Sequence, residues 1–109
     1  MYARVWRAKI LPGKVEEYES AIKSILPAWR KMSGFNGMLV LRTGSGEMLE
    51  ATVVSVWETA DDLRSSENDT FRQGVQRVLS CCEPHASMRE EYVVASEFGY
   101  SGSRDITTT

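Results

Sequence analysis

Apolar residues near the start of the chain recur at helical spacing. Seven of them follow one another three or four positions apart, with one adjacent pair, so they form one stripe along a helix. They are Val15, Tyr18, Ile22, Ile25, Leu26, Trp29 and Met32. Acidic residues occupy the early turns and basic residues the late turns, which suits the helix dipole. The pattern predicts an amphipathic helix that ends at Gly34, with a kink or a break near Leu26 because Pro27 has no amide hydrogen.

Shorter apolar segments on either side of this helix are typical of β-strands. The first ends in Leu11-Pro12-Gly13-Lys14, the second follows Gly34-Phe35-Asn36-Gly37, the third closes at Val54-Ser55-Val56-Trp57-Glu58, and the last spans Met88 to Phe98. Thr43-Gly44-Ser45-Gly46 is typical of a hairpin turn between the second and third strands. The order β-α-β-β-α-β predicts an α+β, ferredoxin-like fold with an antiparallel sheet.

The second helical region is expected to be split. Thr59 can cap a first short helix, with Asp61 and Asp62 at its positive end. Asn68 or Asp69 can cap a second helix. The apolar stripe of that second helix consists of Phe71, Val75, Val78 and Leu79. We therefore expect a short break around residues 65–67.

The strands carry apolar residues on both faces. In the first strand Tyr2, Trp6, Ala8 and Ile10 alternate with Ala3 and Val5, and the segments 38–41 and 53–54 repeat the two-sided pattern. Helices cover only one face of a sheet in this topology. We therefore expect a homodimer that pairs through the uncovered sheet faces. One domain is expected over residues 1–100, followed by a flexible tail over residues 101–109 that has little apolar content.

Composition narrows the class further. A chain of 109 residues has the common size of one domain. Thirteen basic and fifteen acidic residues give a net charge of −2 with no basic stripe, which argues against nucleic acid as a partner. The sequence shows neither a signal peptide nor a membrane-spanning run, so a cytoplasmic protein without a membrane partner is expected. The adjacent Cys81 and Cys82 are expected to be reduced, because a disulfide between neighbours closes a strained ring.

Together these segments resemble the antibiotic biosynthesis monooxygenase superfamily of small dimeric α+β barrels. The resemblance rests on Pro12-Gly13-Lys14, Gly34-Phe35-Asn36-Gly37, Val56-Trp57-Glu58 and Phe71, and it covers residues 1 to about 100. It implies a pocket between the sheet and the helices of each protomer. Some members of the family oxidise quinols or polycyclic aromatic compounds with molecular oxygen and no bound cofactor, whereas others degrade haem.

The haem-degrading members differ from this chain at their functional positions. They use an asparagine on the first strand together with a tryptophan and a histidine on the second helical region. Counting from the shared turns places Trp6, Ser66 and Val75 at these positions. Without the histidine this helix has no axial ligand for iron, so haem turnover is not expected.

Candidate site residues follow from strand alternation and from the helix stripe. Arg4 and Trp6 share the strand face that would look toward the helices. Arg4 could hold a phenolate or a developing oxyanion and Trp6 could stack on an aromatic substrate, while the structural alternative is a core tryptophan and an arginine that pairs at the rim. Tyr18 and Trp29 belong to the helix stripe, where they either pack in the core or form a wall of the pocket.

His85 is the only histidine and therefore the only candidate for an imidazole base. It lies in the loop before the last strand, where an exposed histidine without catalytic function is the alternative. Its nearness to Cys81 and Cys82 suggests a metal site, but a closed site needs a further ligand and the two cysteines point in different directions from a helix end. We expect no metal.

Two classes of function remain open from the sequence. One is a cofactor-independent monooxygenase acting on a small aromatic, polyketide-like or quinol substrate. The other is a non-catalytic, ligand-binding or stress-related dimeric α+β barrel. A tight apolar pocket that contains Arg4, Trp6 and a tyrosine would favour the first class, and an interface filled by side chains would favour the second.

Overall fold

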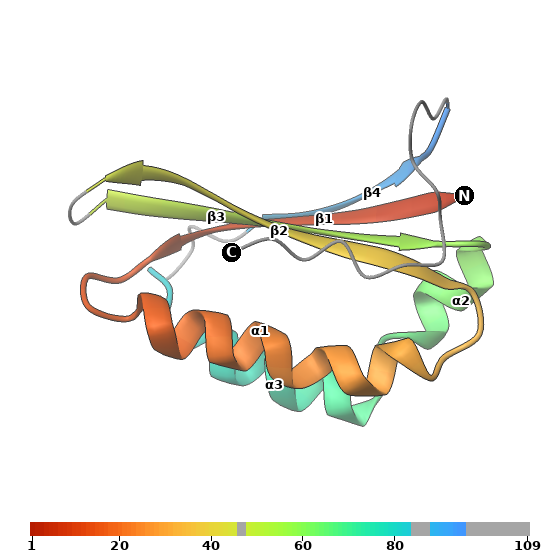
Figure 1. The fold of residues 1–109 in the computed structure, drawn as a ribbon, viewed down its shortest axis with the longest axis horizontal. Helices are drawn as coiled ribbons and strands as arrows, with labels where there is room; N and C mark the ends of the chain where they lie inside the picture. The colour runs from red at the N-terminus through yellow and green to blue at the C-terminus, as the bar shows by residue number, and fades with distance from the viewer. Residues whose placement is uncertain (46–47, 84–87, 96–109) are drawn as a thin grey trace.

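The computed structural model has the α+β, ferredoxin-like fold that the sequence predicts, with the second helical region in two pieces (Figure 1). The structure describes residues 1–45, 48–83 and 88–95. The elements in chain order are β1 (Tyr2–Ile10), α1 (Val15–Arg30), β2 (Phe35–Ser45), β3 (Met48–Trp57), α2 (Ala60–Ser65), α3 (Asp69–Leu79) and β4 (Met88–Val93).

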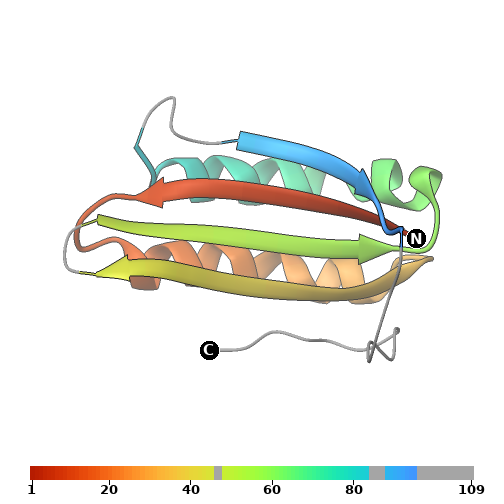
Figure 2. The same ribbon diagram turned by 90° about the horizontal axis from the view of Figure 1, so that it is seen from above.

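The four strands form one antiparallel sheet in the order β2-β3-β1-β4 (Figure 2). The central strand β1 pairs with β3 over its whole length, and this register places Arg4 opposite Ser55 and Trp6 opposite Val53. On its other side β1 pairs with β4, where Glu91 lies opposite Arg4. Because directly opposed residues share a face, Arg4 and Ser55 both point to the side of the sheet that carries α1 and α3.

The predicted stripe of α1 faces the sheet, and five of its seven members are buried: Tyr18, Ile22, Ile25, Leu26 and Trp29. Pro27 does not break the helix, which continues to Arg30. Pro27 and Lys23, whose carbonyl group loses its helical partner, are both exposed. Water can therefore satisfy that carbonyl, which explains why the helix continues through the proline. Gly34 follows the helix with φ of +79°, a left-handed conformation that favours glycine.

The split of the second helical region is confirmed, and side-chain caps define its two pieces. The hydroxyl of Thr59 accepts a hydrogen bond from the amide of Asp62 at 3.0 Å and so caps α2. The side chain of Asn68 accepts from the amide of Phe71 at 3.0 Å and caps α3. Residues 66–68 between the two helices form a connector that crosses the end of the core.

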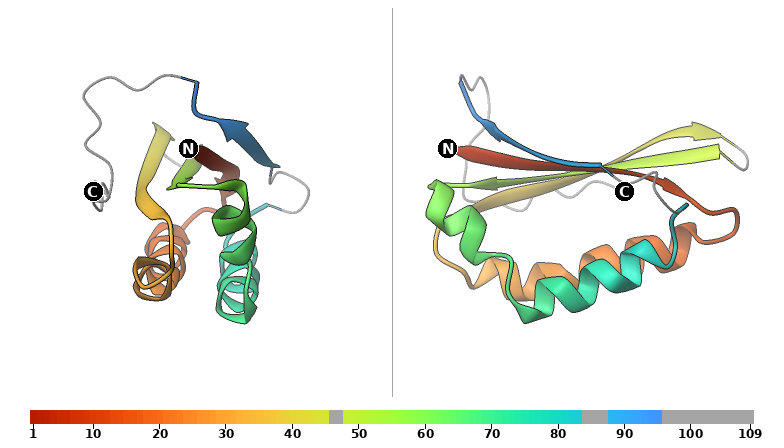
Figure 3. Two further views of the ribbon diagram at one scale, coloured as in Figure 1. Left: turned by 90° about the vertical axis from the view of Figure 1, so that its right-hand side faces the viewer. Right: turned by 180° about the vertical axis from the view of Figure 1, so that it is seen from behind.

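The outer face of the sheet carries apolar residues, as the alternation predicts, together with polar ones such as the ion pair of Arg7 and Glu90, and neither long helix covers it (Figure 3). Its apolar residues are Ala3, Val5, Leu39, Leu41, Val54, Val56 and Tyr92. Of these, Leu41 is 42 % exposed and Tyr92 is 44 % exposed. The homodimer expected from this face stays a prediction.

Several expectations concern residues outside the described part of the chain. The flexible tail at 101–109, Gly46 of the predicted hairpin turn and the end of the last strand at Phe98 are among them. The other residues of that turn, Thr43, Gly44 and Ser45, lie in β2 instead, because the pairing with β3 continues to Ser45. Within the described residues the last strand ends at Val93, and Val94 and Ala95 follow it without regular structure. None of the described helices combines the length and the apolar character that a bilayer crossing requires.

Candidate functional site

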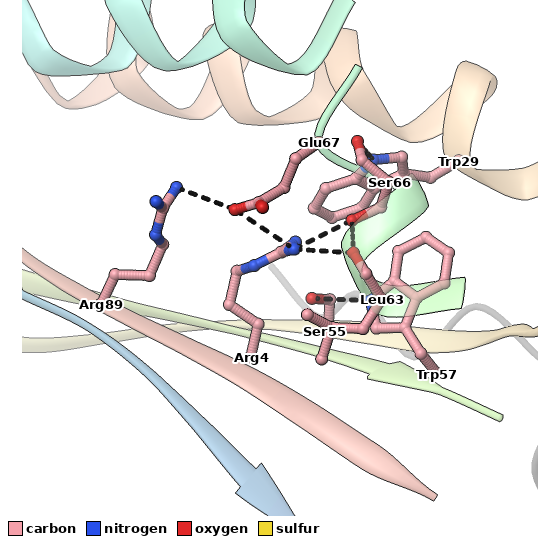
Figure 4. A network of polar contacts seen from close by, with 8 residues as sticks. All are labelled: Arg4, Trp29, Ser55, Trp57, Leu63, Ser66, Glu67 and Arg89. Carbon is pink, nitrogen blue, oxygen red and sulfur yellow. Dashed lines mark hydrogen bonds and ion pairs between the residues drawn. The ribbon is translucent and has the colours of Figure 1, made fainter. Parts of the chain in front are cut away.

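Arg4 is a buried cation at the boundary between the sheet and the helices (Figure 4). Only 2 % of the residue is exposed. Its Nη2 donates to the backbone carbonyl of Leu63 at 2.9 Å and to Oγ of Ser66 at 3.0 Å. Both acceptors lie at the end of α2 and the start of the connector, so Arg4 ties this segment to the sheet.

Acidic groups partly balance the charge of Arg4. Oε1 of Glu67 lies 3.7 Å from Nη2 of Arg4 and 3.4 Å from Nη1 of Arg89, so one carboxylate serves two arginines. Burial lowers the pKa of Arg4, and the nearby carboxylate of Glu67 partly opposes that shift. The guanidinium remains a cation at neutral pH.

Two nitrogen atoms of Arg4 have no hydrogen-bond acceptor among the described residues, although both are buried. They are Nε and Nη1. The guanidinium instead lies against aromatic rings, with its central carbon 5.0 Å from the ring centroid of Phe71 and 5.7 Å from that of Trp29. Such contacts stabilise a cation but do not replace hydrogen bonds. Arg4 therefore keeps two buried donors that an oxygen atom of a ligand can meet once the site opens.

A small cavity lies beside Arg4, between the sheet and the helices. Its volume is about 10 Å³, which is the space of about one water molecule. The lining residues are Arg4, Trp6, Ile22, Ile25, Trp29, Met38, Val53, Ser55 and Phe71. Apart from Arg4 and Ser55 these side chains are apolar or aromatic, so the cavity is mainly apolar and the cation of Arg4 lies beside it.

Ser55 is the second polar residue of the cavity wall, and it is 1 % exposed. Its Oγ accepts a hydrogen bond from Nε1 of Trp57 at 3.1 Å (Figure 4). Trp57 is itself completely buried, so the indole holds the serine hydroxyl in place. No hydrogen bond from the hydroxyl of Ser55 to an acceptor is found in the described part of the chain.

Trp29 closes the site from the helix side. Its ring is stacked on that of Phe71, with centroids 5.6 Å apart, and its Nε1 donates to the backbone carbonyl of Ser66 at 3.2 Å. Arg4 and Trp29 thus hold the Leu63–Glu67 segment through three hydrogen bonds. This segment is therefore bound to two residues of the cavity wall.

The structure brings together three of the five residues that the sequence nominates. Arg4, Trp6 and Trp29 line one cavity. Tyr18 does not line it, because it lies three turns of α1 before Trp29, about 16 Å along the helix axis. It is buried beside Cys82, and burial raises its pKa. His85 lies outside the described residues, so its proposed role as a base stays a prediction.

The two cysteines are free, as expected from their adjacency, and both are buried. The thiol of Cys82 donates to the backbone carbonyl of Val78 at 3.2 Å. Burial raises the pKa of Cys82 to about 11, and the neighbouring Cys81 contributes to the shift. A thiol with this pKa is protonated at neutral pH and therefore a poor nucleophile.

The fold and the comparison with known families together give the class of the protein. The antiparallel sheet has two long helices on one face and a small cavity between sheet and helices, which defines an α+β domain of the ferredoxin-like class. Residues 1–77 then match the family described as Antibiotic biosynthesis monooxygenase. Since this match covers most of the chain, the protein belongs to that family. A search of curated proteins finds no match.

Solved structures agree on the fold at low sequence identity. SnoaB from Streptomyces nogalater, a cofactor-independent oxygenase, is 15% identical with a TM-score of 0.73, covering 90% of this chain and 96% of that one. A conserved protein from Methanosarcina mazei is 19% identical with a TM-score of 0.71, over 84% of this chain and 91% of the other. At these identities the likeness shows the fold alone.

Proposed function

We propose that the protein is a cofactor-independent monooxygenase whose small aromatic, polyketide-like or quinol substrate binds as an anion beside Arg4. The observation that carries this proposal is the buried guanidinium of Arg4 beside an aromatic cavity, with two nitrogen atoms that have no hydrogen-bond acceptor among the described residues. A cation in a dry site favours the ionised form of a phenol or an enol. Family membership and the fold shared with a cofactor-independent oxygenase support the same class of reaction.

The chemistry of such a substrate explains why no metal or flavin is needed. An electron-rich phenolate or enolate can pass an electron to oxygen, and the resulting pair combines at carbon. For a substrate with a reactive CH₂ group, the balanced reaction converts CH₂ and O₂ into C=O and H₂O. The protein must hold the anion and exclude water, which are the tasks that Arg4 and the aromatic wall perform.

The residues that line the cavity restrict how acidic the substrate must be. Neither a carboxylate nor an imidazole is among the residues that line the cavity in the described part of the chain. The substrate should therefore be acidic enough to ionise with the help of Arg4 alone, unless His85 reaches the site as predicted. A phenol or enol that is conjugated with a carbonyl group meets this requirement.

Binding of an aromatic ring requires the site to open, because the cavity holds about one water. The element proposed to move is the Leu63–Glu67 segment, which Arg4 and Trp29 of the cavity wall hold through three hydrogen bonds. A ligand oxygen that binds Nε or Nη1 of Arg4 shifts the guanidinium and weakens the hydrogen bond from Nη2 to Ser66. In the proposed mechanism this segment moves outward when the anion binds and returns after product release.

The closed cavity also favours a second candidate function, a ligand-binding protein without catalysis. The side chains of the core fill most of the space between sheet and helices, which is what a binding or stress-related barrel would show if its ligand were small. Oxygen consumption distinguishes the two functions. We expect the wild type to consume oxygen with 1,8-dihydroxy-9-anthrone or simple quinols, and His85→Ala to be slower if the imidazole reaches the site. Ligand binding without oxygen uptake would favour the second candidate.

We predict that the protein is a homodimer built through the outer face of the sheet. Light scattering at micromolar concentration should give twice the chain mass of 12.3 kDa. Leu41→Glu, which places a charge on that face, should give the monomer mass because a buried unpaired carboxylate is costly. Leu79→Glu is the matched control, since Leu79 has similar exposure at the end of α3 and should stay dimeric. A monomeric wild type would contradict the prediction.

We predict that haem is not degraded. Ser66 and Val75 stand where the haem-degrading members keep a tryptophan and a histidine, and in this structure Ser66 is fully buried and bound to Arg4. An absorbance titration with haem, followed by addition of a reductant, should leave the haem spectrum without conversion to an open-chain product. Stoichiometric binding followed by such conversion would overturn the prediction.

A further inference from the structure

Arg4 and Ser55 form a pair of buried donors on neighbouring strands. They are opposite each other in the β1–β3 register, so their Cβ atoms are about 5 Å apart on the helix-facing side of the sheet. Both are nine-tenths or more buried, and both line the same cavity. Each has a donor that no described group accepts: Nε and Nη1 of Arg4, and the hydroxyl proton of Ser55.

The hydrogen bond from Trp57 determines what Ser55 can do. Because Nε1 of Trp57 donates to Oγ, the serine acts as an acceptor on that side, and its own proton must point elsewhere. A buried hydroxyl without an acceptor is unfavourable, and the same is true of the unpaired nitrogen atoms of Arg4. Both residues line one cavity, whose accessible surface is apolar while it is closed, so a ligand that opens the site can meet the donors of both.

We propose that Ser55 is the second oxygen-binding residue of the site and that it makes the site selective for aromatic hydroxyketones. In these ligands a carbonyl oxygen stands beside the ionised hydroxyl oxygen. The ionised oxygen binds Arg4, whose Nε is the guanidinium nitrogen nearest the sheet, and the carbonyl oxygen accepts the proton of Ser55. A ligand with two adjacent oxygen atoms can accept from both donors, whereas a ligand with one oxygen atom leaves one donor unpaired. Trp57 acts as a positioning residue, because it reaches the ligand only through Ser55.

This inference deepens the proposed function and rests on the same site, but it concerns binding and can be tested without turnover. The probes are 1-hydroxy-2-acetonaphthone, which has the adjacent carbonyl, and 1-naphthol, which lacks it. Quenching of tryptophan fluorescence gives the affinity of each. The wild type should bind the hydroxyketone more tightly than 1-naphthol. The hydrogen bond from Ser55 should contribute a factor of about five to ten to this ratio of affinities, as expected for one neutral hydrogen bond.

The variants Ser55→Thr and Ser55→Val isolate that hydrogen bond, because their side chains have nearly the same shape and only threonine keeps the hydroxyl. Ser55→Thr should keep the preference and Ser55→Val should lose about five- to tenfold of it. Arg4→Met should weaken both ligands by a similar factor, since both bind through their ionised oxygen. Ser24→Ala removes a serine hydroxyl that bonds to Ala21 on α1, outside the cavity, and should change nothing.

The outcomes separate this inference from the proposed function. A preference that is the same in Ser55→Thr and Ser55→Val would overturn it, as would a wild type that binds neither probe. A preference that follows the hydroxyl supports it, even if no substrate gives oxygen uptake, in which case the monooxygenase proposal alone fails. A third outcome is that oxygen uptake depends on Arg4 while the two Ser55 variants show equal uptake and the same ligand preference. This outcome would leave the proposed function intact and refute the role of Ser55.

Discussion

Arg4→Met is expected to lower kcat/KM for oxygen consumption by about 10²–10³-fold, the loss typical of one preorganised electrostatic contact in a dry site. The same substitution should leave the free energy of unfolding within about 1 kcal/mol of the wild type. A buried charge that loses much hydration contributes little net stability, and replacing it with an apolar side chain of similar size is often neutral or stabilising. Urea unfolding and oxygen uptake on the same preparation measure both effects.

The neighbours of Arg4 explain why the variant should still fold. Glu67 is about one-third exposed and keeps its ion pair with Arg89, so no isolated charge is left buried. The carbonyl of Leu63 keeps two hydrogen bonds, from the hydroxyl and from the amide of Ser66. Arg72→Met, which removes an exposed arginine from its pair with Asp69, is the matched control and should change neither quantity.

Two results would contradict this account of Arg4. Destabilisation by more than about 3 kcal/mol would mean that Arg4 is a structural residue that holds the Leu63–Glu67 segment, and its unpaired nitrogen atoms would then have no functional meaning. Unchanged oxygen uptake in a folded Arg4→Met protein would exclude an anion site beside this residue. In either case the ligand-binding candidate would become the better explanation of the fold.

The fold was accessible from the sequence because its signals are local. The stripe of α1 and the Thr59 and Asn68 caps each lie within one element or at its end, and each appears in the structure as predicted. The predicted break near Leu26 was wrong, because the free-energy cost of a proline in a helix depends on whether the carbonyl that loses its partner can bind water. An exposed carbonyl can bind water and a buried one cannot, and this exposure depends on the tertiary structure.

The site was only partly accessible from the sequence. Alternation along β1 correctly places Arg4 and Trp6 on the helix-facing side, because the period of a strand is two. Ser55 and Phe71 were not nominated, since a serine inside a strand and an apolar residue in a helix stripe are ordinary core positions. Their role follows from the β1–β3 register and from the packing of α3, which bring them to the guanidinium. A sequence alone specifies neither.

Gly74 of α3 packs directly against Ile25 of α1. A Cβ atom added there would lie 2.5 Å from Cγ1 and 2.7 Å from Cδ1 of Ile25, and no other side chain would come within 4 Å. Ile25 also lines the cavity beside Arg4, so this contact sets how close α3 lies to the site. Glycine lowers helix stability by about 1 kcal/mol relative to alanine, but at this position it allows the two helices to pack closely.

The effect of Gly74→Ala is expected to reverse sign with the residue at position 25. In the wild type it should lower the free energy of unfolding by up to about 2 kcal/mol, because overpacking costs about 1–3 kcal/mol and exceeds the gain in propensity. Ile25→Ala should itself cost about 2–5 kcal/mol, and in that background Gly74→Ala should stabilise by about 1 kcal/mol because the methyl group has space. Ile22→Ala is the control background, since Ile22 is buried on the same helix but does not contact the added Cβ. Urea unfolding of the wild type and the five variants provides the measurement. If Gly74→Ala has the same effect in both alanine backgrounds, contact with Ile25 is not what requires glycine at this position.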